Sequence, residues 1–84
     1  MRRTRALRKP SSPLTAILAA NIRAFREEKS LSQEEFADIC GLHRTYVGSV
    51  ERGERNVTLS TLEVFASVMG VLVPQLLTGK TPEK

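Results

Sequence analysis

The most constraining feature of this sequence is the stretch from residue 33 to residue 53, where one glycine separates two segments with the length and pattern of short helices. Gly41 can adopt the left-handed backbone conformation that ends one helix and redirects the chain, because it has no Cβ to clash. Ala37 is small where two helix backbones must cross closely. Val47 and Val50 are three residues apart, so they share one face of the second helix and can pack against the first. The stretch therefore predicts two short helices joined by a sharp turn.

The outward face of the second predicted helix is polar. At about 100° of rotation per residue, this face comprises Arg44, Thr45, Gly48, Ser49 and Arg52. Arginine donates to the acceptor pair of guanine, hydroxyl groups reach a base edge or a phosphate, and glycine allows close approach. We therefore expect a helix-turn-helix unit that reads the major groove of double-stranded DNA. The alternative is a solvated amphipathic helix, which the same pattern also permits.

Capping signals mark the helices that precede this turn. Ser12 is a favourable N-cap and Pro13 a favourable first residue for a helix that extends to about Lys29. Ser32 and Glu35 have the spacing of a capping box at the start of the first short helix. The residues expected to face the core from the long helix are Leu14, Leu18, Ile22 and Phe25.

Two further helices are predicted after the second short helix. The first begins at Thr58 or Ser60 and ends at Gly70. The second is a short helix within Val71–Leu77. Because the sequence contains no alternating pattern typical of a strand, it predicts an all-α fold of five helices.

The length and the distribution of charge indicate one domain with a basic arm. A chain of 84 residues buries only about 60% of its unfolded surface, so association with a second copy would help it. Five of the 13 basic residues lie in residues 1–9, which leaves eight basic and nine acidic residues in residues 10–84. We expect a disordered basic arm over 1–12, a helix-turn-helix domain over 13–79 and a flexible tail over 80–84. The arm either adds a salt-sensitive attraction to phosphates or only keeps the chain soluble.

The residue types argue against chemistry at a catalytic or metal site. The single cysteine, Cys40, lies on the apolar side of its predicted helix, which is typical of a packing role in a reducing cytoplasm. No second thiol or paired histidine accompanies it, so we expect no metal. The sequence holds no catalytic set and no glycine-rich phosphate loop, which predicts a protein that is not an enzyme and needs no cofactor. No apolar run approaches the roughly 18 residues of a membrane span, and we expect a cytoplasmic protein.

The end of the chain offers more apolar side chains than a small bundle can bury. A contiguous apolar surface on a small protein usually marks an interface. A twofold dimer would place two reading helices about 34 Å apart, one turn of DNA. The alternative is that these residues only close the core of the monomer. The residues expected at the interface are Val64, Val68, Val71, Leu72, Val73, Leu76 and Leu77.

From about Leu18 to Leu77 the sequence resembles the Cro and phage-repressor family of five-helix DNA-binding domains, which have a lambda-repressor-like fold. Within this region, the run HRTYVGSVERGERN over residues 43–56 is most similar to the controller proteins of restriction–modification systems. The resemblance implies a homodimer that binds a palindromic operator ahead of its own gene and activates or represses by occupancy. RNA polymerase is a further candidate partner.

The resemblance also implies roles for single residues. Arg44 and Thr45 would read base edges and Tyr46 would adjust to the site. Gln33, in the first turn of its helix, would anchor a phosphate beside unpaired backbone N–H groups. The residues that would hold the DNA backbone or neighbouring bases are Ser49, Arg55 and Asn56.

Two departures and one structural pair complete the resemblance. Gly48 stands where such controllers commonly have serine, which leaves the operator preference open. His43 stands where they often have aspartate, and it would cap the reading helix, touch a phosphate when protonated, or be an ordinary surface histidine. Arg26 and Glu51 are expected to form an ion pair that orients the reading helix.

Other functions are compatible with the same fold. A phage-type repressor would share it, as would an antitoxin that grips a toxin with its apolar end. An alternative from another class is an adaptor that binds a protein and no DNA. The adaptor gives no reason for one side of the predicted domain to gather Arg44, Thr45, Ser49, Arg55 and Asn56.

Overall fold

The computed structural model describes residues 12–79, and within them it contains five helices and no strand. The all-α prediction of five helices is therefore confirmed. The predictions of a basic arm over 1–12 and a tail over 80–84 fall on residues that lie outside the described ones, except for Ser12, which is the first residue of the first helix. The helices are α1 (Ser12–Glu28), α2 (Gln33–Cys40), α3 (Arg44–Glu51), α4 (Leu59–Met69) and α5 (Val73–Leu76).

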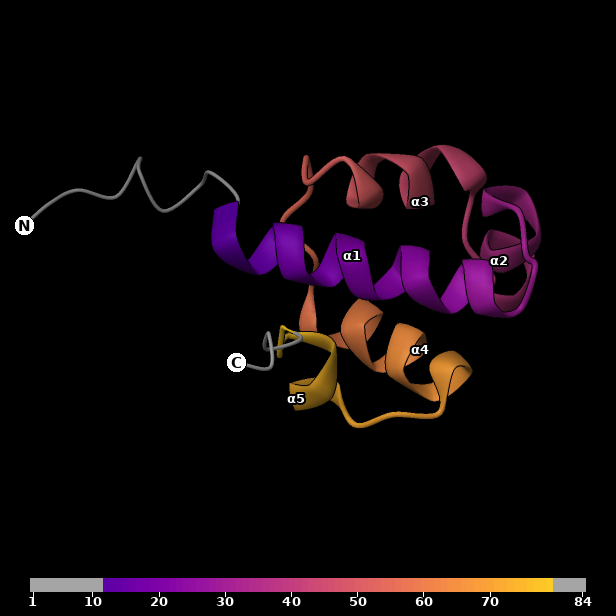
Figure 1. Ribbon diagram of the computed structural model, residues 1–84. Coiled ribbons are helices and arrows are strands. Elements are labelled where there is room, and N and C mark those ends of the chain that lie inside the picture. The colour runs from indigo at the N-terminus through magenta and orange to yellow at the C-terminus, as the bar shows by residue number, and fades with distance from the viewer. Residues whose placement is uncertain (1–11, 80–84) are drawn as a thin grey trace, which may run out of the picture.

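The long helix α1 runs through the middle of the molecule (Figure 1). Helix α3 lies along one side of it, α4 and α5 lie along the other, and α2 closes the end where α1 finishes. Contacts of α1 with both α3 and α5 tie the two sides together. This arrangement leaves one flank of α3 free to face a partner.

The predicted caps are present at the ends of the short helices. The backbone N–H of Glu35 donates to Ser32 Oγ at 2.9 Å, and the backbone N–H of Ser32 donates to Glu35 Oε1 at 2.8 Å, which completes the capping box. Gly41 has φ 73°, the left-handed conformation that the sequence predicted for the turn. At the start of α4 the structure selects Thr58 as the N-cap, with Thr58 Oγ1 accepting from the backbone N–H of Thr61. Helix boundaries are therefore set by local side-chain chemistry.

The core forms around an aromatic residue of α2. Phe36 is fully buried, stacks on Phe65 of α4 with ring centroids 5.9 Å apart, and meets Phe25 of α1 edge-on at the same distance. Val47 and Val50 of α3 are also buried, as their spacing predicted. Each such side chain contributes about 1.5–3 kcal/mol by leaving water, so the inner face of α3 is held firmly against α1 and α2.

One residue predicted at a dimer interface belongs to the core. Leu76 is only 1% exposed within the monomer, so the prediction that it meets a second subunit is wrong. The physical reason is that α5 folds back on α1, where Asn21 Nδ2 donates to the backbone oxygen of Leu76 at 2.8 Å. The other predicted interface residues are half-buried or, for Leu72, 70% exposed.

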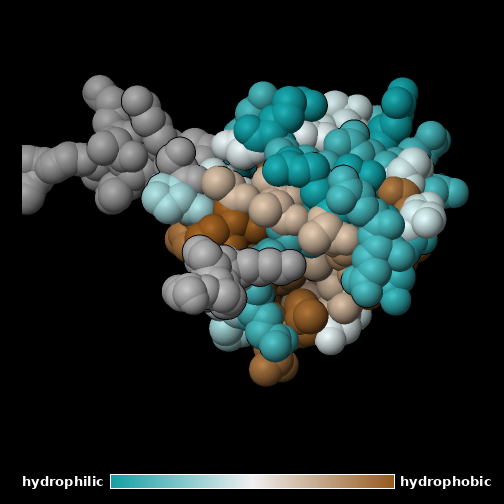
Figure 2. All heavy atoms as spheres, in the orientation of Figure 1, coloured by the Kyte–Doolittle hydropathy of each residue, from teal (hydrophilic) through white to brown (hydrophobic). Residues whose placement is uncertain are grey.

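The surface divides by character. Figure 2 shows hydrophilic residues gathered over the side of α2 and α3 and more hydrophobic residues over the side of α4 and α5. The exposed large apolar side chains include Leu59 and Leu72. Among the residues that the structure describes, no helix has the length and apolarity that crossing a bilayer requires.

Candidate DNA interface

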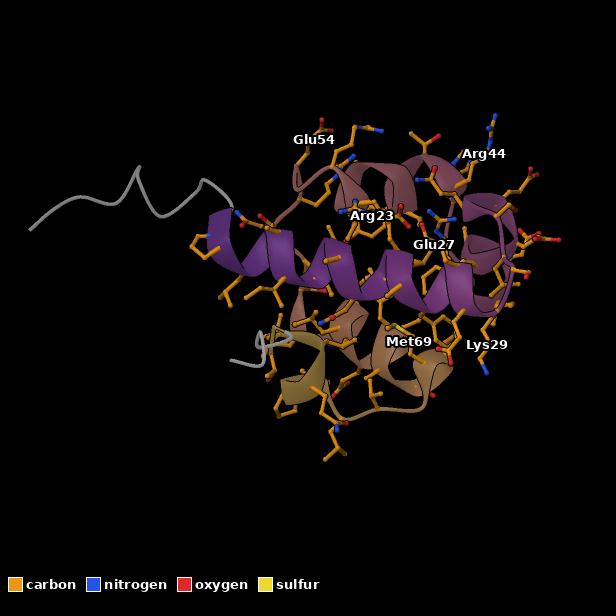
Figure 3. The ribbon with its side chains drawn as sticks, viewed as in Figure 1. Arg23, Glu27, Lys29, Arg44, Glu54 and Met69 are labelled. Carbon is orange, nitrogen blue, oxygen red and sulfur yellow. The ribbon has the colours of Figure 1, made fainter. Side chains whose placement is uncertain are left out.

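The first turn of α3 presents two polar side chains to solvent. Arg44 and Thr45 are exposed, whereas Val47 and Val50 on the opposite side are buried. Figure 3 shows Arg44 pointing away from the body of the molecule at the edge formed by α2 and α3. The side chain of Arg44 is therefore placed to meet a partner without any rearrangement of the helix.

A polar hollow of about 690 Å³ lies between the start of α2 and the outer face of α3. Its lining contains three guanidinium groups and the amide of Gln33, so it suits an anionic or hydrogen-bonding surface. The residues that line it are Arg26, Ser32, Gln33, Glu34, Arg44, Thr45, Gly48 and Arg52.

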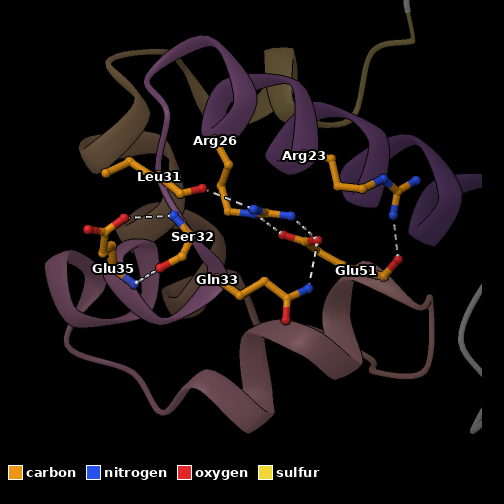
Figure 4. A network of polar contacts seen from close by, with 7 residues as sticks. All are labelled: Arg23, Arg26, Leu31, Ser32, Gln33, Glu35 and Glu51. Atoms are coloured by element: carbon orange, nitrogen blue, oxygen red, sulfur yellow. Dashed lines mark hydrogen bonds and ion pairs between the residues drawn. The ribbon is translucent and has the colours of Figure 1, made fainter.

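A buried carboxylate behind this hollow joins three helices (Figure 4). Glu51 is 6% exposed and accepts two hydrogen bonds from Arg26, from Nε at 2.7 Å and from Nη2 at 2.9 Å. Gln33 Nε2 donates to Glu51 Oε1 at 3.0 Å, and Arg23 Nη1 donates to the backbone oxygen of Glu51 at 2.8 Å. Arg26 Nη1 also donates to the backbone oxygen of Leu31. The contacts connect α1, α2 and the end of α3, and they contain the ion pair expected from the resemblance.

The ion pair shifts the pKa of both partners. The hydrogen bond to Glu51 raises the pKa of Arg26 above its ordinary value. Burial alone would raise the pKa of Glu51, but the hydrogen bonds from Arg26 and Gln33 and the charges of Arg26 and Arg23 outweigh it and hold that pKa below its usual range. Glu51 therefore stays charged at neutral pH, and its charge is compensated.

Gln33 has a role that the sequence did not predict. Gln33 is exposed at the start of α2, as expected for a phosphate contact, but its amide nitrogen already donates to Glu51. An ideal Cβ built on Gly48 would lie 3.4 Å from Gln33 Oε1, so the amide oxygen lies against α3. Because the amide nitrogen of Gln33 donates to Glu51, the amide oxygen faces Gly48.

Ser49 does not face outward, and this part of the sequence prediction is wrong. Ser49 is 4% exposed; its Oγ donates to the backbone oxygen of Tyr46 at 2.7 Å and accepts from Arg55 Nε at 2.9 Å. The cause is the loop after α3, which returns along this flank so that Arg55 covers it. The guanidinium of Arg55 also lies 5.5 Å from the centre of the Tyr46 ring. A projection of one helix takes no account of such a loop.

The loop and Tyr46 border a second hollow of about 570 Å³. Tyr46 is half-buried, whereas Arg55 and Asn56 are exposed at its rim. Gly48 is buried beneath the side chains of Gln33 and Arg52. The predicted site residues therefore line two separate hollows, with Ser49 buried. The first hollow contains Gln33, Arg44, Thr45, Gly48 and Arg52, and the second contains Tyr46, Arg55 and Asn56.

One contact of the site was not predicted from the sequence, and the role of His43 was left open. The pairing of Arg52 with Glu54 was not predicted, yet Arg52 Nε lies 3.0 Å from Glu54 Oε2. The only signal was opposite charges on either side of the glycine at position 53. His43 adopts the capping role: its Nδ1 accepts from the backbone N–H of Thr45 at 3.1 Å.

The described residues contain no group of histidine, cysteine and carboxylate side chains that could hold a metal ion. Cys40 is a half-buried free thiol, and burial raises its pKa to about 11. A thiol with that pKa is protonated at neutral pH and behaves as an apolar side chain.

Comparison with known proteins places the same segment among transcription regulators. The helix-turn-helix family matches residues 22–76. Control protein C.SmaI of Serratia marcescens is 61% identical over 62 residues, which is 74% of this chain and 74% of that protein.

Solved structures show the same fold. The hypothetical transcription factor NHTF from Neisseria superposes with a TM-score of 0.77 at 49% identity, covering 84% of this chain and 81% of that one. The restriction-modification controller protein C.AhdI from Aeromonas hydrophila gives a TM-score of 0.67 at 39% identity, covering 74% and 94%. SinR, a master regulator for biofilm formation solved in complex with DNA, gives 0.66 at 32% identity, covering 73% and 98%.

Proposed function

Because this chain belongs to the helix-turn-helix family of DNA-binding transcriptional regulators, we propose that it is a restriction–modification controller that binds a palindromic operator as a homodimer. It acts by occupying the DNA in the cytoplasm, without catalysis or a cofactor. RNA polymerase bound beside the operator is its further partner. The similarity to C.SmaI and C.AhdI supports the controller subtype over the phage repressor and the antitoxin.

One observation carries this proposal: Arg44 and Thr45 are exposed at the start of a helix whose other end is anchored by a buried ion pair. An α-helix fits the major groove, and an exposed arginine near its N-terminus can donate two hydrogen bonds to guanine O6 and N7. Gln33 and Arg52 line the same hollow as Arg44 and Thr45, whereas Arg55 and Asn56 line the second hollow, beside Tyr46. These residues would contact phosphates and neighbouring bases on either side of the reading helix.

The direct test is a gel shift with the DNA just upstream of the gene, compared with a random duplex at two salt concentrations. A regulator shifts the upstream DNA preferentially, and its affinity falls steeply as salt rises. Equal binding to both duplexes, or none, would favour the adaptor. Neighbouring reading frames for a methyltransferase and an endonuclease would support the controller subtype.

Substitution of Arg44 tests the role of the reading helix. Arg44→Ala should cost about 1–3 kcal/mol of operator binding and relax the preference at one base pair of each half-site, because it removes a contact to a base edge. Arg55→Ala is the comparison: it should weaken binding more uniformly across sequences. Fluorescence anisotropy with a set of single-base operator variants measures both effects. A uniform loss in Arg44→Ala would assign that residue to the DNA backbone instead.

A further inference from the structure

An exposed ion pair lies at the end of the reading helix. Arg52 Nε donates to Glu54 Oε2 at 3.0 Å and Arg52 Nη2 donates to Glu54 Oε1 at 3.2 Å, so one carboxylate holds one edge of the guanidinium through two parallel bonds. The side chains are 60% and 55% exposed. Figure 3 shows Glu54 beyond the end of α3, on the same side of the molecule as Arg44.

The backbone fixes where this carboxylate stands. Gly53 has φ 73°, and the backbone N–H of Glu54 donates to the backbone oxygen of Ser49 at 3.0 Å. These features form the end of α3 and do not involve the side chain of Glu54. A substitution of that side chain therefore leaves the helix end intact.

The free end of the Arg52 guanidinium lies over Gly48. An ideal Cβ at position 48 would lie 3.4 Å from Arg52 Nη1, which is van der Waals contact, so the guanidinium rests directly on the helix at this position. Arg52 lines the same hollow as Arg44 and Thr45. The edge that Glu54 occupies is the one containing Nε, which leaves the end formed by Nη1 and the second N–H of Nη2 for another acceptor.

We infer that Glu54 is a positioning residue that holds Arg52 ready to read a guanine in the major groove, and this inference rests on the proposed function. Guanine presents O6 and N7 side by side, and the free end of a guanidinium matches that pair. Holding the arginine in place in advance reduces the ordering that binding requires. The carboxylate also repels phosphates when the helix sits in a wrong register, which disfavours other sequences.

Stabilisation of the fold does not account for the ion pair between Arg52 and Glu54. Exposed ion pairs contribute little to stability because solvent screens the charges and two long side chains must be ordered. Removing Glu54 therefore changes DNA recognition more than folding. Removal of Glu54 lowers the specificity of DNA binding in two ways. Arg52 loses its fixed orientation on the cognate site, and the repulsion of phosphates on other sites disappears.

The experiment compares the wild-type protein and four variants on two duplexes. The cognate duplex is the one that the wild-type protein selects from a random pool, and the second is a random duplex of the same length. The variants are Glu54→Gln, Arg52→Ala and the double variant, and Glu63→Gln is the charge-matched control, because Glu63 is exposed on α4, across α1 from α3. Thermal melting verifies that each variant is folded.

We expect Glu54→Gln to bind the random duplex about twofold to fivefold more tightly, the equivalent of one exposed ion pair, with a salt slope steeper by about 0.9. Affinity for the cognate duplex should stay constant or fall, and the preference for one G·C pair in each half-site should weaken. In the Arg52→Ala background, Glu54→Gln should no longer alter that preference. Glu63→Gln should behave like wild type.

Two results would overturn the inference and leave the proposed function standing. The first is an equal gain in affinity for both duplexes in Glu54→Gln, which would show that Glu54 acts only through its negative charge. The second is an effect of Glu54→Gln on base preference that stays the same in the Arg52→Ala background, which would show that Glu54 does not act through Arg52. A wild-type protein that selects no sequence from the pool would overturn the proposed function itself.

Discussion

Ser49 shows how one small side chain connects the reading helix to the loop that follows it. Its hydroxyl donates to the backbone of Tyr46 and accepts from Arg55, and both groups lie at the border of the site. The hydroxyl is buried, so water does not compete for these bonds. Arg55 is thereby held beside Tyr46 in one orientation.

We expect Ser49→Ala to lower the free energy of unfolding by about 1 kcal/mol, because a buried hydrogen bond is lost and Arg55 Nε loses its acceptor. Urea denaturation measures the change. Ser67→Ala, at an exposed position of α4, is the control and should be close to neutral. Equal midpoints for the two variants would show that Ser49 is dispensable for stability.

At the scale of elements, the angle between α1 and α3 is determined by polar as well as apolar contacts. The valines of α3 pack against the core, but apolar packing is non-directional. The bidentate contact of Arg26 with Glu51, together with the bond from Gln33, has a defined geometry. These contacts lock both the register and the tilt of α3 relative to α1 and α2.

The lowered pKa of Glu51 predicts an acid-sensitive contribution to stability. Because the folded pKa is below the unfolded value of about 4.3, the contribution is fully present above that value and is lost as pH falls through the folded pKa. Glu51→Gln should cost about 1–3 kcal/mol at pH 7, and this difference from wild type should shrink below pH 4. Urea unfolding between pH 7 and pH 3 measures it. A difference that is constant with pH would refute the role of the charge.

The elements could be predicted from the sequence because their signals are local. Ser32 with Glu35, Gly41 and Gly70 act through the backbone within a few residues of themselves, and the structure has each of them in the predicted place. The contacts that refine the site are not local in this sense. The bond from Gln33 to Glu51 depends on how two helices dock, and the position of Ser49 depends on how a loop returns. Neither can be obtained from the periodicity of one helix.

At the scale of the whole molecule, the two sides of α1 have different surfaces. The side of α3 is polar, and the side of α4 and α5 exposes apolar groups beside half-buried valines (Figure 2). Leu76 serves the core, which leaves Leu72 as the most exposed of the residues predicted at a dimer interface. Contact between two copies through this side would leave both reading helices free to face DNA.

Substitution of Leu72 tests the association of two copies. Burying a leucine contributes about 1.5–3 kcal/mol, so Leu72→Glu should weaken dimerisation by at least about tenfold while the helical circular dichroism stays unchanged. Sedimentation equilibrium measures the monomer–dimer constant. Leu59→Glu is the matched control, because Leu59 is 77% exposed on α4 and is not among the predicted interface residues. If only Leu59→Glu weakened dimerisation, the interface would instead lie at the beginning of α4.

The ion pair of Arg26 and Glu51 lies at the end of α3, whereas Arg44 and Thr45 project from its first turn. The groups that hold the helix are thus separate from those that we propose to select the DNA sequence. If the proposed function holds, exchange of the residues in the first turn changes the operator that is bound while the scaffold keeps its stability, so new specificities can evolve, or be engineered, without compensating changes in the core.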